Sequence, residues 1–180
     1  ALPIYVKGST VISLMYESWE LRSDDVDIGY CKKRKIKVAG TNENHRKLRV
    51  FEHIGHLAAK MIFEAGYEIF NNNIIIWSND NFGKVIYDTL SILRPKKIIQ
   101  TNSFEIVKNN ITGTDYMFLC DYHEQRSYND ATFFDFKELK KLNDSFGVIH
   151  LYGDINNVEL NNQNIFLYPS KPGKPQQMTY

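Results

Sequence analysis

Residues 71–90, NNNIIIWSNDNFGKVIYDTL, place the signal for a buried strand directly before the signal for a helix. The short run at 74–77 is continuously apolar, which is typical of a strand inside a sheet. The next residues repeat at the spacing of one helix face: Phe82, Val85, Ile86, Thr89, Leu90 and Leu93. A strand that runs at once into a helix is the repeating unit of parallel α/β sheets. This stretch therefore restricts the fold class more than any other part of the chain.

The same alternation of strand and helix continues after residue 90. Further strands are expected at 96–102, 115–122, 147–154 and 163–169. Helical segments are expected between them, at 103–110 and 135–147. The pattern predicts an α/β fold: a Rossmann-like, mainly parallel sheet with helices on both faces, over residues 44–170.

The chain before residue 44 predicts part of a smaller α/β subdomain, over residues 1–43. A strand is expected at 9–15, a helix at 26–34 and a strand at 36–40. Residues 171–180, which contain two prolines and two lysines, are expected to form a connecting tail.

The longest predicted helix covers residues 45–66. Asn42 or Asn44 is expected to cap its start, and Gly66 is expected to end it. Apolar residues recur on one face, which is expected to pack on the core: Val50, Ile54, Leu57, Met61 and Ala65. Glu52, His53 and His56 fall on the other face and are expected to be solvated, so no metal site is predicted there.

Composition excludes several classes of protein. The chain is 43% hydrophobic and carries a formal net charge of +1, which favours a globular domain and gives no general case for nucleic-acid binding. No apolar stretch approaches the roughly 18 residues of a membrane span, and the N-terminus lacks the pattern of a signal peptide. Cys31 and Cys120 stand in no metal-binding spacing. We expect free thiols, a cytoplasmic location and a small-molecule or nucleotide ligand, with a homo-oligomer left open.

The turn between the first buried strand and its helix is the candidate cofactor site. Its residues are Ser78, Asn79, Asp80, Asn81, Phe82 and Gly83. The dinucleotide fingerprint G-x-G-x-x-G requires glycine at 78, 80 and 83, and only the last is glycine. Such folds place an acidic residue about 20 positions further on, where it binds the ribose. In this chain that position falls near Thr101 and Asn102, and neither residue is acidic. These two residues complete the candidate cofactor-binding set.

Two interpretations of this turn remain open. Asp80 or Asn81 can cap the helix, and a carboxylate at position 80 would then occupy the place of a phosphate. Alternatively, NAD or NADP binds there in an altered pose. Two unit charges about 4 Å apart repel by about 1 kcal/mol in water and about 4 kcal/mol at an effective dielectric of 20, so Asp80 disfavours the second interpretation.

The order of the segments over residues 23–170 resembles the D-2-hydroxyacid dehydrogenase family. The stretches that carry the resemblance are DDVDIGYCKKRKIKVAGTNEN, VFEHIGHLAAKMIFEAG, NNIIIWSNDNFGKVIYDTL, TDYMFLCDYHEQ and NNQNIFLYPSKPG. The resemblance implies a Rossmann fold, NAD or NADP as cofactor and oxidoreductase activity. However, the catalytic histidine of the family aligns with Ser170, no arginine stands near LYGDIN, and the supporting glutamate has no counterpart. The hydride-transfer machinery of the family therefore does not carry over.

Other catalytic candidates follow the later strands. His123 lies beside Glu124 and Arg126 after the expected strand at 115–122, and His150 and Asp154 accompany the next strand. Open α/β sheets bind ligands at these carboxyl ends, and histidine can act as a base near neutral pH. Two functions remain: an NAD(P)-binding oxidoreductase with altered chemistry, or a non-catalytic Rossmann-like binding or scaffolding domain of a larger protein.

Overall fold

The structure is a computed structural model that describes residues 7, 9–21, 24–43 and 45–171. By its internal contacts the chain divides into two compact units, residues 1–51 and 52–180. Each unit is described by itself.

The first unit contains a two-stranded parallel sheet, β1 (Val11–Ser13) and β2 (Lys37–Ala39), in which Ile12 pairs with Val38. A short 3-10 helix, η2 (Ser18–Glu20), and helix α1 (Ile28–Lys33) lie between the strands in sequence. The Asp27 carboxylate starts α1 by accepting the Tyr30 N–H at 2.8 Å.

The second unit is built on five parallel strands in the order β4-β3-β5-β6-β7. The strands are β3 (Asn73–Trp77), β4 (Lys97–Thr101), β5 (Tyr116–Leu119), β6 (Gly147–His150) and β7 (Phe166–Tyr168). The helices are α2 (Val50–Glu64), α3 (Asn81–Ile92), α4 (Phe104–Asn110), α5 (Phe136–Leu142) and α6 (Asn157–Asn162). The predicted α/β class and parallel sheet are confirmed.

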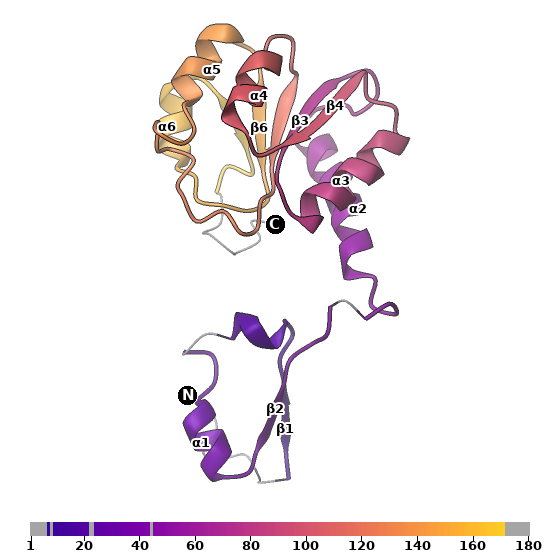
Figure 1. Cartoon of the computed structure of the whole chain (residues 1–180), viewed down its shortest axis with the longest axis vertical. Helices are drawn as coiled ribbons and strands as arrows, with labels where there is room; N and C mark the ends of the chain where they lie inside the picture. The colour runs from indigo at the N-terminus through magenta and orange to yellow at the C-terminus, as the bar shows by residue number, and fades with distance from the viewer. Residues whose placement is uncertain (1–6, 8, 22–23, 44, 172–180) are drawn as a thin grey trace. The chain divides into compact units, whose positions relative to one another are not determined.

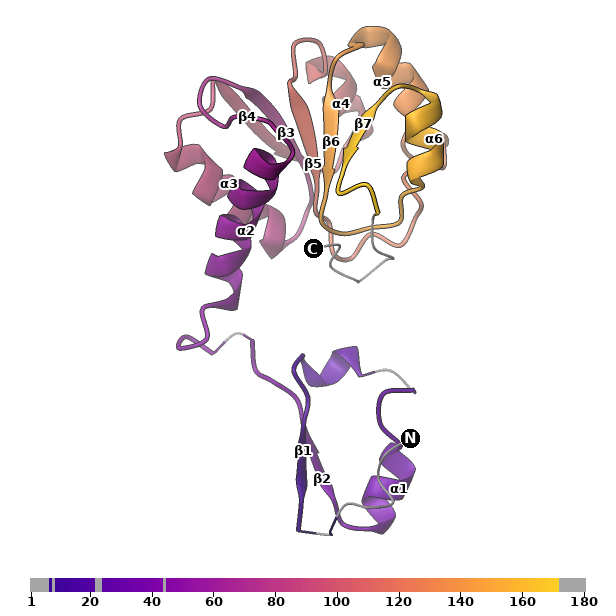
Figure 2. The same cartoon turned by 180° about the vertical axis from the view of Figure 1, so that it is seen from behind.

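The helices of this unit cover both faces of the sheet (Figures 1 and 2). Side chains of β3 alternate between two separate cores, as the strand period of two requires. Ile74 and Ile76 pack in the core beneath α2 and α3. Ile75 and Trp77 pack in the opposite core, which α4, α5 and α6 cover. All four side chains are buried, which explains the uninterrupted apolar run in the sequence.

Helices α2 and α3 approach each other closely at a glycine. A Cβ atom added to Gly55 of α2 would lie 2.0 Å from Thr89 Oγ1 of α3. The Thr89 hydroxyl donates at 2.8 Å to the Val85 carbonyl of its own helix, which fixes the side chain in the contact. The closeness of the two helices therefore depends on the missing side chain at position 55.

The long helix differs from its prediction at its start. It begins at Val50 instead of residue 45, because Arg49 adopts φ 53°, a left-handed conformation that a helix cannot contain. It ends before Gly66, as predicted. Its buried face consists of Ile54, Gly55, Ala58, Met61 and Ile62. Leu57, which was expected on that face, is only partly buried.

Two later boundaries also differ. Strand β6 ends at His150, four residues earlier than expected. Helix α6 was not predicted, because its six residues contribute a single buried side chain, Leu160. None of the helices within the described part of the chain is both long and apolar enough to cross a membrane.

Candidate functional site

The candidate site lies at the carboxyl ends of β3 and β5. From β3 the chain moves outward to β4, and it then returns to the other side of β3 to form β5. Trp77 and Leu119, the last residues of the two strands, are register partners. Two connections that leave neighbouring strands in opposite directions form a switch point, where open α/β sheets hold their ligands.

Asp80 closes the turn after β3. Its backbone is extended, at φ −109° and ψ −178°, and its Oδ1 accepts the Gly83 N–H at 3.1 Å. The same oxygen accepts the Ser78 hydroxyl at 2.7 Å. Asp80 is therefore the N-cap of α3, which is one of the two interpretations drawn from the sequence.

Asp80 also reaches across the switch point. Its second oxygen, Oδ2, accepts the Tyr122 N–H at 2.8 Å, in the turn that follows β5. In return, Asp121 Oδ2 accepts the Asn79 N–H at 3.0 Å, and Asp121 Oδ1 accepts the His123 N–H at 3.1 Å. Two carboxylates thus hold the two turns together through backbone amides. Sequence reasoning did not single out Asp121, although its position directly after the third strand was a signal.

Burial and charge act on Asp121. Desolvation raises the pKa of its carboxyl group, the hydrogen bond from Asn79 opposes that shift, and the neighbouring charge of Asp80 adds to it. The acidic pair therefore makes this edge of the sheet unfavourable for a third negative group.

Gly83 is the position of the fingerprint that the chain retains, and it lies where the helix packs closely against the end of the sheet. A Cβ atom at this position would lie 2.4 Å from both Cβ and Oγ of Ser78, and 2.9 Å from Gln100 Nε2. Helix α3 therefore starts directly against the end of the sheet, as a dinucleotide fold requires.

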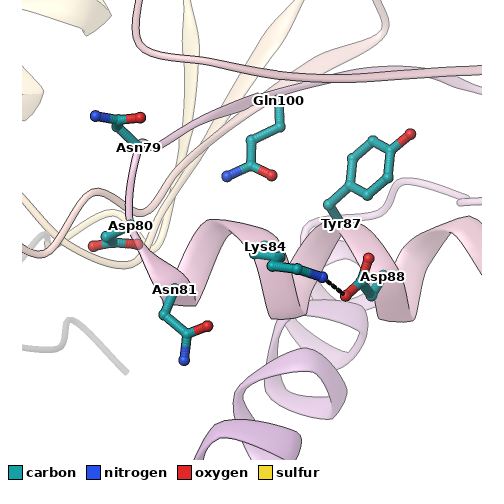
Figure 3. Close-up of a pocket in the computed structure, with 7 residues that line it drawn as sticks. All are labelled: Asn79, Asp80, Asn81, Lys84, Tyr87, Asp88 and Gln100. Atoms are coloured by element: carbon teal, nitrogen blue, oxygen red, sulfur yellow. Dashed lines mark hydrogen bonds and ion pairs between the residues drawn. The ribbon is translucent and has the colours of Figure 1, made fainter.

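An open cleft of about 620 Å³ runs along the first turns of α3. Its lining residues are Asn79, Asp80, Asn81, Lys84, Tyr87, Asp88 and Gln100. Figure 3 shows the Gln100 amide extending from the strand side toward the helix. The Lys84 ammonium pairs with Asp88 at 2.5 Å, so part of its charge is already neutralised. The cleft is lined mainly by polar side chains, and its two aspartates outnumber its one lysine.

A neighbouring cavity of about 280 Å³ brings together residues that the sequence presented as two groups. Asn79, Asp80 and Asn102 come from the candidate cofactor set, whereas Asp121, His123, Glu124 and Arg126 follow β5. Thr101, by contrast, is buried, and its hydroxyl accepts the Ser103 N–H at 3.0 Å.

Of the later catalytic candidates, His123 lines this cavity, whereas His150 and Asp154 do not. His123 is exposed. His150 is fully buried, with Nε2 2.9 Å from the Gly153 carbonyl oxygen, and burial lowers its pKa to about 4. A substrate would reach the His150 ring only if the surrounding side chains moved. Asp154 is partly buried, and its backbone bonds to the segment at Ser127 and Tyr128.

The structure gives no support for metal binding by side-chain clusters in its described ranges. Across residues 9–21, 24–43 and 45–171, no group of three or more histidine, cysteine, aspartate or glutamate side chains is placed to hold a metal ion. His53 and His56 on α2 are exposed, with ring centroids 6.1 Å apart.

The comparisons with known proteins are limited to folds. No family model matches the chain, and no curated protein matches it in sequence. Among solved structures, the chain is similar to a pyruvate reductase of Chlamydomonas reinhardtii, with 13% identity and a TM-score of 0.55 over 88% of this chain and 55% of that chain. It is also similar to an NAD-dependent formate dehydrogenase from Staphylococcus aureus in complex with NAD, with 14% identity and a TM-score of 0.46 over 89% and 58% of the two chains.

A dehydrogenase from Rhizobium meliloti is a third similar structure, with 14% identity and a TM-score of 0.43 over 90% of this chain and 66% of that chain. The likeness to the pyruvate reductase shows the fold, a Rossmann-like α/β fold. The chain spans about 55% of the length of that reductase structure.

Proposed function

We propose that this chain is a Rossmann-like domain related to the D-2-hydroxyacid dehydrogenases that serves as a non-catalytic binding or scaffolding domain and does not hold a dinucleotide through its first turn. One observation supports the proposal above all others: the Asp80 carboxylate accepts hydrogen bonds from the Ser78 hydroxyl and from the N–H groups of Gly83 and Tyr122. One of the helix-start donors that would bind a phosphate, the Gly83 N–H, is thus directed at a side chain of the protein itself.

The energetic argument follows from charge. A pyrophosphate that approached this turn would meet Asp80 directly, at a cost of about 1–4 kcal/mol for a single pair of charges about 4 Å apart. Asp121 adds a second negative group across the switch point. The catalytic arginine and histidine of the family also have no counterparts, and Ser170 stands at the aligned histidine position. Asp80 and Asp121 therefore disfavour the binding of a dinucleotide, whereas the missing arginine and histidine disfavour hydride transfer.

A second function is an NAD(P)-linked oxidoreductase with altered chemistry. The cleft of about 620 Å³ beside α3 favours it, because its volume is within the usual range of ligand pockets. Lys84 and Gln100 line that cleft and are able to donate hydrogen bonds to a cofactor. In this function the cofactor would lie along α3, with the turn at Asp80 at one end of its cleft.

Calorimetric titration with NAD(H) and NADP(H) tests the choice. We expect weak or undetectable binding by the wild-type protein. Replacing both Ser78 and Asp80 by glycine removes the carboxylate and restores the fingerprint, so binding should tighten about ten- to a thousandfold. Asn81→Gly is the matched control in the same turn, because it adds a glycine and leaves Asp80 in place. Micromolar binding by the wild-type protein would instead favour the oxidoreductase.

A further inference from the structure

A further cavity of about 320 Å³ lies at the same edge of the sheet, on the side of Trp77 and Phe104, and shares Asn102 and Arg126 with the cavity of about 280 Å³. Its apolar lining consists of Trp77, the last residue of β3, with Phe104 and Phe133. Its polar lining consists of Asn102, Arg126, Asp130 and Thr132. An apolar wall with a few polar groups is the usual composition of a small-molecule site, and the strand ends are the usual location.

Trp77 contributes a hydrogen-bond donor without a partner. The side chain is 1% exposed, and its Nε1 has no hydrogen-bond acceptor among the residues that the structure describes. Its ring is held edge-on to Phe133 and Phe134, with centroids at 5.7 and 4.8 Å. A buried donor of this kind lowers stability unless an acceptor reaches it. An acceptor on a ligand would remove that cost.

Arg126 also lines the cavity, with a side chain that is 62% exposed and a guanidinium held by two contacts. Its guanidinium carbon lies 3.7 Å from the centroid of the Phe133 ring. Its Nε and one terminal nitrogen donate to the two Glu124 oxygens, at 2.8 and 2.7 Å. The remaining N–H groups of the guanidinium are left for other acceptors. Arg126 is thus a positioned donor whose charge is already balanced.

The charges of the cavity disfavour an anion. The Asp130 carboxylate accepts the Thr132 N–H at 2.9 Å and the Thr132 hydroxyl at 2.7 Å, and these bonds lower its pKa. The hydrogen bonds from Arg126 likewise lower the pKa of Glu124. At neutral pH the lining therefore carries the Asp130 carboxylate beside an Arg126 guanidinium whose charge Glu124, outside the lining, already pairs. A neutral ligand avoids this excess of negative charge.

We propose that this cavity binds a small, neutral aromatic ligand that carries a carbonyl acceptor, such as an aryl carboxamide. The ring would contact Phe104 and Phe133, and the carbonyl oxygen would accept hydrogen bonds from Trp77 Nε1 or Arg126. The amide nitrogen would donate to Asp130. The proposal does not depend on the turn at Asp80, which lines other cavities.

The experiment is an NMR titration of the full ¹⁵N-labelled chain with benzamide, observed at the tryptophan indole N–H signals. Trp77→Phe and Trp19→Phe identify the two signals, because the chain contains two tryptophans. We expect a saturable shift of the Trp77 signal with benzamide, and a clearly weaker effect with ethylbenzene, which lacks the acceptor. Benzoate should bind more weakly than benzamide because of its charge.

A pair of matched variants locates the site. Phe133→Leu removes one aromatic wall and should weaken benzamide binding about two- to tenfold. Phe70→Leu, at an aromatic residue that is 69% exposed and outside the cavity lining, should leave the affinity unchanged. The absence of a saturable shift, equal binding of ethylbenzene, or tighter binding of benzoate would overturn the proposal. The calorimetric titration with NAD(H) and NADP(H) tests the proposed function, and the NMR titration with benzamide tests this cavity. A negative result in one experiment therefore leaves the other proposal unaffected.

Discussion

Asp80 and Asp121 tie together the turns after two adjacent strands, because each carboxylate accepts a hydrogen bond from the backbone of the other's turn. Asp80 binds the Tyr122 N–H at 2.8 Å, and Asp121 binds the Asn79 N–H at 3.0 Å. The exchange joins residues 42 positions apart in the chain. It joins the two turns at the switch point through groups of the protein itself, and it makes the stability of the fold depend on the residues that close the turn after β3.

The first prediction concerns this tie. Asp80→Ala removes the N-cap of α3 and leaves the Tyr122 N–H without its acceptor, so the free energy of unfolding should fall by about 1–3 kcal/mol. Asp88→Ala, on an exposed face of the same helix, should cost under about 0.5 kcal/mol, since its ion pair with Lys84 is solvated. Urea unfolding of both variants provides the measurement. Equal losses would contradict the role given to Asp80.

The second prediction concerns the contact at Gly83. Because an added Cβ would overlap both Cβ and Oγ of Ser78, Gly83→Val should destabilise the protein by about 1–3 kcal/mol through overpacking. Lys84→Ala changes the next residue of the helix, whose side chain is 65% exposed, and should cost under about 0.5 kcal/mol. An unchanged thermal midpoint for Gly83→Val would show that the helix start has room to move.

The third prediction separates the two faces of α2. Met61 is fully buried in the core beneath α2 and α3, so Met61→Ala should cost about 2–5 kcal/mol. Leu57→Ala should cost less than Met61→Ala, because Leu57 is only partly buried. His53→Ala should cost under about 0.5 kcal/mol. Denaturant midpoints of the three variants test this order, and a large loss for His53→Ala would require a contact that this face does not show.

The fourth prediction is a pH dependence caused by His150. Burial lowers its pKa from 6.5 to about 4, so the unfolded chain takes up a proton at a higher pH than the folded protein does. The contribution of His150 is therefore complete above pH 6.5 and is lost as the pH falls toward 4. Between pH 7.5 and pH 5 the loss should be about 2 kcal/mol. In His150→Gln this part of the pH dependence should disappear, as urea unfolding at several pH values would show. Parallel curves for the two proteins would refute the assignment.

The sequence predicted the fold because its strongest signals are local. The apolar run at 74–77 and the helical spacing after it depend on burial on both faces of the sheet, which the structure confirms. The start of α2 was predicted wrongly, because an asparagine before an apolar repeat is typical of an N-cap. The residues near Arg49 also give no sign that its backbone is in the left-handed conformation. Helix α6 was missed because six residues with one buried side chain give no periodic signal.

The candidate site was only partly predictable for the same reason. A capping role for Asp80 follows from its place before a helix, and the structure shows it. The bond from Tyr122 to Asp80 joins segments far apart in sequence, so spacing alone does not reveal it. Whether the Trp77 N–H finds an acceptor among the described residues depends on which side chains surround it in three dimensions. Contacts between residues far apart in sequence form only in the folded sheet. Helix caps and periodic helix faces involve neighbouring residues, so they can be predicted from the sequence.

The three hydrogen bonds that Asp80 accepts also limit the routes by which this domain could evolve. A single replacement of Asp80 by glycine would remove all three bonds at once, and any new phosphate contact would still lack the glycine at position 78. If the proposed function is right, the first step toward a dinucleotide site would therefore lower stability before it raised affinity. A substitution that restores stability elsewhere in the domain would then have to precede the loss of Asp80.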